Sequence, residues 1–269
     1  MFKLAVFVLA VVLSVASAQT SGNYYTFGPS GIACTVGNTN CPHFFLNEVN
    51  GGAVHVPIVN FVYSNANLDP VVVQGGASGE VVLFGAVNGY DFEIYEAYRL
   101  LPLISGAPTG ALYTLHPSNY MCPVTGPCYR LKALALNNGT VTLATSYTEP
   151  YSSTISFIDT NWLADRIMAS ALVQGSVIGG VFTATGVYVK VDDQISCPAS
   201  PQYMCAIGNV RAYNRDINRC WTLVGCVHSG ICPHFLPACA AGYDLISVPS
   251  APNGCNHFYC DASFLTQKH

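Results

Sequence analysis

The placement of its twelve cysteines is the strongest constraint on how this chain of 269 residues can fold. All twelve follow an N-terminal segment that has the order of a secretory signal peptide, with Lys3, the apolar run Leu4 to Leu13 and the small residues Ala16-Ser17-Ala18. We expect cleavage after Ala18, so residues 1–18 are the predicted signal peptide and the chain is predicted to be secreted. An even number of cysteines in an oxidising compartment predicts six disulfides, and reduced core cysteines are the alternative.

Composition and charge exclude several classes of protein. Only 9% of the residues are charged and 51% are apolar, which excludes a disordered chain. The net charge is −4 and the basic residues are scattered singly, which argues against a nucleic-acid partner. The stretch from Ile167 to Val189 carries no charge and is long enough to span a bilayer, but glycines and polar side chains dilute it. We expect a helix end, a glycine stop at Gly175 and two short buried strands there, with no membrane span in the mature chain.

One spacing pattern occurs three times: a Tyr, eight residues, a Cys, five to seven residues, a second Cys, eight residues and an Asn. Its members are Tyr25, Cys34, Cys41 and Asn50, then Tyr113, Cys122, Cys128 and Asn137, then Tyr188, Cys197, Cys205 and Asn214. We therefore predict a three-copy repeat domain over residues 19–215. Within each copy a disulfide is expected to close the short loop, pairing Cys34 with Cys41, Cys122 with Cys128, and Cys197 with Cys205.

The residues around each pattern favour strands, with helices between copies. β-branched and aromatic side chains predict strands at 24–27, 112–115 and 187–191 and returning strands at 58–63 and 140–146. The pairs Asn50-Gly51 and Asn138-Gly139 predict type I′ hairpin turns. Apolar spacing predicts one helix over 91–101 and a second capped by Thr160 or Asn161. The expected fold is α+β but mainly β, with disulfide-stapled antiparallel meanders joined by two helices.

The remaining cysteines predict a separate disulfide-rich C-terminal module over residues 216–269. They are Cys220, Cys226, Cys232, Cys239, Cys255 and Cys260. Fifteen pairings are open, of which we expect Cys220 with Cys226. The other four are expected to nest around a hairpin with strands at 242–248 and 257–259, because a module of this size needs such cross-links.

Parts of the first two copies resemble a secreted domain family of bacteria and some protists, known only as a domain of unknown function. The resemblance is carried by Cys41, Phe45 and Val49-Asn50 in the first copy, and by Tyr113, Cys122, Gly126-Pro127-Cys128 and Leu136-Asn137 in the second. It covers roughly residues 24–215. The resemblance implies a secreted fold with no established activity and assigns no functional residue.

No catalytic or cofactor-binding motif is present in the sequence. The tetrapeptide Cys-Pro-His-Phe occurs at 41–44 and 232–235 and suggests a metal site, with His43, His228, His234 and His257 as ligands. However, those cysteines have disulfide partners at hand, and no two His residues stand at helical i, i+4 spacing with an acid. Both observations argue against a metal site. Acid pairs such as Glu93 with Glu96 are more typical of a solvated face than of acid-base chemistry. We therefore expect no cofactor and no metal.

Three functions remain open. The favoured one is a secreted or cell-surface binding or structural protein whose partner is an extracellular protein or glycan, because stapled loops rich in Tyr, Asn and Gly suit such contacts. The second is an extracellular protease inhibitor that acts through the Cys-rich tail. The third is a hydrolase with an unrecognised site, which requires that at least two members of one set lie in the same pocket: His55, His116, Asp91, Asp159 and Asp165.

Asn138 lies in the sequon Asn138-Gly139-Thr140 and is the predicted glycosylation site. The predicted hairpin places it at an exposed tip. The alternative is a bare Asn whose only role is to form the turn.

Overall fold

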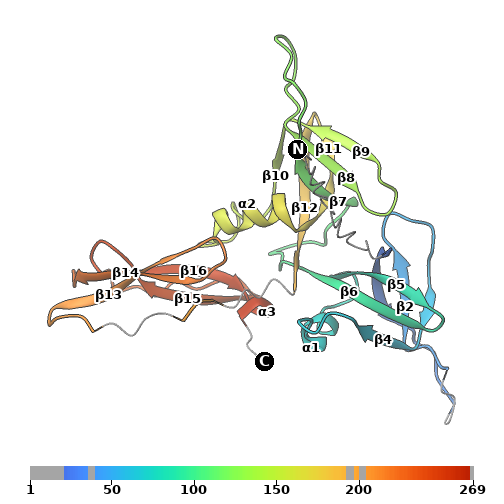
Figure 1. Cartoon of the computed structure of the whole chain (residues 1–269), viewed down its shortest axis with the longest axis horizontal. Coiled ribbons are helices and arrows are strands. Elements are labelled where there is room, and N and C mark those ends of the chain that lie inside the picture. The colour runs from blue at the N-terminus through green and yellow to red at the C-terminus, as the bar shows by residue number, and fades with distance from the viewer. Residues whose placement is uncertain (1–20, 36–39, 192–196, 200–203, 267–269) are drawn as a thin grey trace, which may run out of the picture.

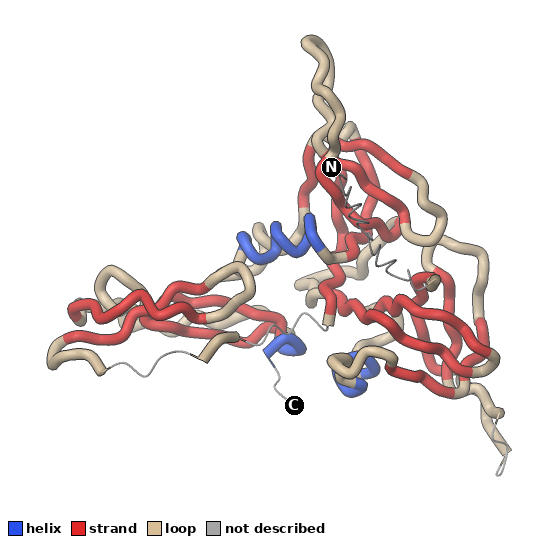
Figure 2. Tube along the Cα trace, in the orientation of Figure 1, coloured by secondary structure: helices blue, strands red, loops and turns tan. Residues whose placement is uncertain are grey.

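The computed structural model describes residues 21–35, 40–191, 197–199 and 204–266. The predicted signal peptide lies outside these residues. The described part of the chain is mainly β, with sixteen strands and three short helices. A large sheet makes up one side of the molecule, and four strands form an elongated arm that extends away from it (Figures 1 and 2).

Twelve strands form the large sheet, and they fall into two halves with the same order of elements. The first half contains β1 (Asn23–Pro29), β2 (Phe44–Glu48), β3 (Val56–Ile58), β4 (Asn60–Tyr63), α1 (Pro70–Gln74), β5 (Val81–Asn88) and β6 (Asp91–Leu100). The second half contains β7 (Ala111–Pro117), β8 (Leu131–Ala135), β9 (Val141–Ala144), β10 (Ser146–Thr148), α2 (Thr160–Ala169), β11 (Leu172–Ile178) and β12 (Val181–Lys190).

The two halves join through the antiparallel pair β6 and β12, in the strand order β3-β2-β1-β5-β6-β12-β11-β7-β8-β9. In each half one further strand pairs in parallel, β4 with β6 and β10 with β12. The halves also share a register shift, which falls at Phe84/Gly85 in the first and at Gln174/Gly175 in the second. The main core lies along these strands and contains the fully buried rings of Phe92, Tyr151 and Phe182.

The helix predicted over 91–101 is wrong, because these residues form β6. Tyr95 is the extra residue at the register shift, since Phe84 pairs with Glu96 and Gly85 with Ile94. A bulge of this kind interrupts the alternation of inward and outward side chains. Ile94, Ala97 and Leu101 therefore all reach the main core, at spacings of three and four residues that imitate a helix, whereas Tyr98 packs in the separate cluster on the other face.

The helix predicted near Thr160 is confirmed as α2, but its ends differ from the prediction. Asp159 is the N-cap, because its side chain accepts a hydrogen bond from the Trp162 amide at 3.1 Å. The helix ends at Ala169, so Gly175 is not its stop. Gly175 lies within β11, where a Cβ atom would be only 2.2 Å from the Thr183 carbonyl oxygen. The close approach of two strands therefore explains this glycine.

Two asparagines tie the halves of the sheet together, and both have positive φ angles, 51° at Asn50 and 61° at Asn137. The Asn50 side chain accepts a hydrogen bond from the Leu112 amide at 3.1 Å and donates to the Leu112 carbonyl at 2.6 Å. The Asn137 side chain makes the reciprocal pair of bonds with the backbone of Tyr24, both at 2.8 Å. Each half thus supplies an amide side chain that substitutes for a strand partner in the other half.

The two predicted type I′ turns are wrong in detail. A type I′ turn needs positive φ at both central residues, and neither Asn138 nor Gly51 has it. The turn between β8 and β9 is a longer loop, in which the Gly139 amide donates to the Ala135 carbonyl at 3.1 Å and the Ala135 amide to the Thr140 carbonyl at 2.8 Å. Asn138 is exposed in this loop, and its side chain accepts a hydrogen bond from the Thr140 amide at 2.9 Å.

The arm consists of two consecutive hairpins, β13 (Asn209–Arg215) with β14 (Trp221–His228), and β15 (Tyr243–Pro249) with β16 (Asn256–Ala262), followed by α3 (Ser263–Thr266). The hairpin predicted around 242–259 is confirmed as the second of these. The first spans the expected module boundary between residues 215 and 216. We call residues 197–199 and 204–266 the hairpin arm.

The structure has six disulfides, and two of the predicted pairings are wrong. Cys34 pairs with Cys41 and Cys122 with Cys128. In the arm, Cys197 pairs with Cys220 and Cys205 with Cys226, in place of Cys197 with Cys205 and Cys220 with Cys226. Cys232 with Cys255 and Cys239 with Cys260 repeat the same spacings of 23 and 21 residues. The third sequence copy therefore opens a cross-linked hairpin, and a three-copy meander is not the architecture found.

No helix within the described ranges is long and apolar enough to cross a membrane. The uncharged stretch at 167–189 forms the end of α2, β11 and most of β12.

Candidate binding groove

A groove of about 640 Å³ lies on the second hairpin of the arm. One wall is the exposed segment between β14 and β15, and the other is the start of β16, with Phe157 from the loop before α2. The lining residues are Phe157, Cys232, Pro233, His234, Phe235, Leu236, Gly254, Cys255, Asn256, His257 and Phe258. None of them is an acid, a lysine or an arginine, so the groove suits an uncharged occupant.

Two disulfides hold the walls of the groove in place. Cys232 connects the start of one wall to Cys255, and Cys239 connects its far end to the buried Cys260 of β16. The segment between them contains no helix or strand, so these cross-links replace the hydrogen bonds of a regular element.

Phe157 has an unusual backbone conformation, with φ at 62°. A bulky side chain rarely adopts this left-handed region. Its carbonyl accepts a hydrogen bond from the Cys260 amide at 2.9 Å, which connects the loop before α2 to the edge of β16. The side chain stays 41% exposed and contributes to the groove.

The aromatic rings of the groove form an open cluster. The Phe258 ring lies 6.2 Å from Phe157 in an edge-on arrangement and 5.6 Å from Phe235. Leu236 is 78% exposed, and the neighbouring Ile231 is fully exposed. Several large apolar side chains thus meet water on one short stretch, which is typical of a surface that contacts a partner.

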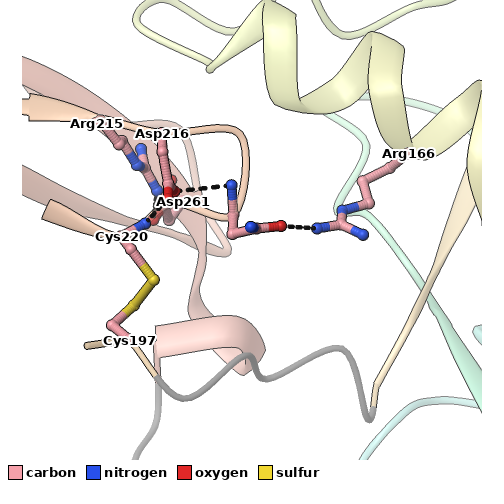
Figure 3. The surroundings of a disulfide bond; sticks show 7 residues. Arg166, Cys197, Arg215, Asp216, Cys220 and Asp261 are labelled. Carbon is pink, nitrogen blue, oxygen red and sulfur yellow. Dashed lines mark hydrogen bonds and ion pairs between the residues drawn. A yellow bond between two sulfur atoms is a disulfide. The ribbon is translucent and has the colours of Figure 1, made fainter. Parts of the chain in front are cut away.

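A buried charge cluster attaches the arm to α2 and so positions the groove (Figure 3). The Arg215 side chain is 2% exposed and forms an ion pair with Asp261 of β16. Its Nη1 also lies 3.8 Å from Oδ2 of Asp159, the cap of α2. Arg219 Nη1 lies 3.6 Å from Asp261. On the other side of the junction, Arg166 of α2 donates to the Asn218 side chain at 3.3 Å.

Aromatic rings complete this junction. The Arg215 guanidinium lies 4.4 Å from the Tyr259 ring centre and 5.4 Å from that of Trp221. Arg219 lies 5.1 Å from the ring centre of Trp162 in α2. Burial lowers the pKa of Arg219, and the Asp261 carboxylate opposes that shift. Among the described residues, Nε and Nη1 of Arg215 have no hydrogen-bond partner, so the two aspartates and the rings are the groups that stabilise this buried guanidinium.

A second cavity, of about 460 Å³, lies where the two halves of the sheet meet. Polar side chains that line it form hydrogen bonds with other groups of the protein. Tyr188 contacts the Gly79 carbonyl and Gln174, both at 2.9 Å, and Arg99 donates to the carbonyls of Val72 and Gly75. Burial and the nearby Glu80 raise the pKa of Tyr188 to about 12. These contacts make the cavity part of the junction between the halves.

The predicted hydrolase residues are dispersed. His116 lies in a small pocket with Lys190, and Asp159 lies in the junction of the arm. Asp91 accepts a hydrogen bond from Asn60, and Asp165 is exposed on α2. His55 packs edge-on against Phe45. The pockets that contain His116 and Asp159 include no other member of the set.

The four suggested metal ligands do not lie at one place. His234 and His257 line the groove, whereas His43 precedes β2 and His228 ends β14. Cys41 and Cys232 are in disulfides. Among the described residues, no three His, Cys, Asp or Glu side chains form a metal-binding group.

Sequence reasoning singled out residues 232–235 for their histidine and missed their apolar neighbours. The available signal was the run Pro233-His234-Phe235-Leu236-Pro237 between two cysteines, which combines large apolar side chains with prolines. Phe157 gave no signal, because it is 75 or more residues away from this segment in the chain.

The fold and the groove define a disulfide-rich, mainly β protein with a cross-linked hairpin arm. No family model matches the chain, so the resemblance to a bacterial secreted family gains no support. No solved structure matches either. The chain is similar to an uncharacterised protein of Dictyostelium discoideum, with 28% identity over 271 aligned positions that cover 96% of this chain and 93% of the relative. The similarity extends over both the sheet and the arm and assigns no activity.

Proposed function

We propose that this chain is an extracellular binding protein and that the groove on its hairpin arm holds an apolar segment of a protein partner. The observation that carries the proposal is the set of exposed apolar side chains around a groove without charged residues. The six disulfides fit the extracellular setting.

A protein segment suits this groove better than a glycan. Sugars bind through many hydroxyl hydrogen bonds, and the groove offers only the polar side chains of His234, Asn256 and His257. Leu236 and Ile231 add aliphatic surface, which gains most from contact with another apolar surface. A glycan is therefore the alternative occupant that the experiment must exclude.

The test is selection of peptides from a displayed random library on the immobilised full-length chain. Selected peptides should be rich in apolar residues, and the double variant Phe235→Ser with Leu236→Ser should weaken their binding at least about tenfold. Val124→Ser is the matched control, because Val124 is equally apolar and fully exposed but lies in the loop closed by Cys122 and Cys128. It should leave affinity unchanged.

Two outcomes would contradict the proposal. In one, no selected peptide responds to the Phe235 and Leu236 substitutions. In the other, a glycan array shows binding that the same double variant abolishes, which assigns the groove to a sugar.

Protease inhibition is a second candidate, and one observation favours it. The segment between Cys232 and Cys239 is exposed, carries Phe235 and Leu236, and is tied at both ends by disulfides, as a rigid protease-binding loop would be. A fragment of residues 216–265 would separate Cys220 and Cys226 from their partners, so the assay needs the full chain. Absence of inhibition of serine and cysteine proteases at micromolar concentration would exclude this function.

We also propose that residues 1–18 direct secretion and that Asn138 carries a glycan. The exposed position of Asn138 in the loop between β8 and β9 supports the second proposal. N-terminal sequencing of the secreted protein should begin at Gln19.

A further inference from the structure

The free edge of β16 offers backbone groups to the groove. Among the strands that the structure describes, β16 pairs only with β15, so the two form a two-stranded sheet with open edges. The register places Asn256 opposite Pro249, Phe258 opposite Ser247, and Cys260 opposite Leu245. In an antiparallel pair, alternate residues direct their N–H and C=O groups toward the partner and away from it.

Hydrogen bonds at both ends of the hairpin show which residues face away. The Ser250 amide donates to the Cys255 carbonyl at 3.0 Å, and the Ser263 amide donates to the Gly242 carbonyl at 2.9 Å. On the β16 side, Cys255 and Ser263 are therefore bonded positions. Asn256, Phe258 and Cys260 occupy the alternate positions, whose backbone groups face away from β15. Pro249, opposite Asn256, is consistent with this assignment. Proline has no amide proton, and a non-bonded position does not need one.

One of the outward groups already bonds to another segment of the chain. The Cys260 amide donates to the Phe157 carbonyl, so the edge accepts a neighbouring backbone at that point. Asn256 is exposed and Phe258 half-buried, and both line the groove. The outward backbone groups of these two residues have no hydrogen-bond partner among the residues that the structure describes.

We infer that the groove binds its ligand as an added β-strand, with an extended apolar peptide paired to the outer edge of β16 at Asn256 and Phe258. The inference rests on the proposed function and specifies the form of the partner. Backbone pairing supplies bonds that any sequence can make, and the apolar wall formed by Phe235 and Leu236 selects side chains on one face of the added strand. Phe157 ends the available edge at Cys260, which limits the pairing to a short segment.

The experiment uses a groove-selected peptide of about ten residues, the length of a long strand. Two synthetic versions carry N-methyl groups on alternate backbone amides, in opposite phases. Only one phase removes the protons that face β16. That version should lose affinity about tenfold or more, and the other should bind within about twofold of the parent.

Amide hydrogen exchange of the full-length chain, followed by NMR, gives a second readout. Saturation with the parent peptide should slow exchange at Asn256 and Phe258. The amides of His257 and Tyr259 face β15 and serve as internal controls, because their exchange should not change.

The outcomes separate this inference from the proposed function. If both methylated peptides bind alike and exchange at Asn256 and Phe258 stays fast, strand addition is overturned, while dependence on Phe235 and Leu236 would still uphold the groove. If binding does not depend on Phe235 and Leu236, the proposed function fails and this inference fails with it.

Discussion

The sheet and the hairpin arm stabilise their folds by different means. In the sheet, disulfides close only the loops at Cys34–Cys41 and Cys122–Cys128, whereas Phe92, Tyr151 and Phe182 are fully buried in a continuous core. Four of the six disulfides belong to the arm. These cross-links take the place of a core that two thin hairpins cannot build.

The inner end of the arm is an exception, because it packs on the sheet. Tyr243 and Phe264 join the main core, and the Tyr243 hydroxyl donates to the Pro102 carbonyl at 2.8 Å. The outer end carries the groove and has little apolar burial. The arm is thus anchored by burial at one end and cross-linked at the other, which keeps apolar side chains exposed without collapse.

The largest expected effect comes from removing the charge that joins the two regions. Arg215→Met removes the most deeply buried partner of Asp261 and the cation beside Asp159, leaving Arg219 alone near Asp261, and we expect a loss of about 3 kcal/mol in the stability of the arm. Arg130→Met is the control, because Arg130 is exposed on the sheet. Limited proteolysis with mass spectrometry should show early cleavage in the arm alone. Equal resistance of the two variants would contradict the role of the cluster.

Removal of one disulfide from the arm should destabilise the protein more than removal of one from the sheet. Replacing Cys239 and Cys260 with Ala should cost about 3 kcal/mol, since that bond closes a loop of 21 residues. Replacing Cys122 and Cys128 with Ala should cost about 2 kcal/mol, since that loop spans six. Urea unfolding monitored at the arm tryptophan Trp221 and by far-UV circular dichroism compares the two. A larger loss of unfolding free energy on replacing the Cys122 pair than on replacing the Cys239 pair would contradict the greater dependence of the arm on its disulfides.

Asn137 tests how the sheet itself is joined. Asn137→Ala removes three hydrogen bonds, two to Tyr24 and one to Val49, and places a Cβ-bearing residue without a polar side chain at φ 61°. We expect a loss of about 2 kcal/mol in the unfolding free energy of the sheet. Asn137→Gly relieves the φ strain but not the lost bonds, so it should recover only part of the stability. Full recovery by Gly would show that the bonds contribute nothing.

The smallest effect is expected at Thr140→Ala. This change removes the sequon at Asn138 but keeps the backbone amide of residue 140, which donates to the Asn138 side chain. Protein secreted from eukaryotic cells should lose the mass of one glycan, and its thermal midpoint should shift by less than about 2 °C. An unchanged mass would show that Asn138 is bare.

How far the sequence predicted the structure depends on whether local or distant contacts decide each feature. The strands near Tyr25 and Tyr113, the helix α2 and the hairpin around residues 242–259 follow from local pattern and are present. β6 was misread because a bulge at Tyr95 shifts the alternation. A single sequence does not reveal such a bulge, which depends on the partner strand β5.

The groove and the disulfide pairing of the arm depend on distant residues. Cys197 and Cys205 resemble the earlier short loops in spacing, but the hairpin of β13 and β14 brings Cys220 and Cys226 beside them. Phe157 is held at the groove by its backbone bond to Cys260 and by the nearby junction of Asp159 with Arg215. Neither contact leaves a periodic signal in the sequence.

The most direct test of this account is the affinity of a groove-selected peptide for the full-length chain during a titration with dithiothreitol. Hydrogen exchange of β5 and β6 amides is followed in the same samples. We expect peptide binding to be lost as the arm disulfides open, while the sheet amides stay protected by their core. Binding that persists after complete reduction, or loss of protection in the sheet at the same point, would contradict a groove maintained by the cross-linked arm.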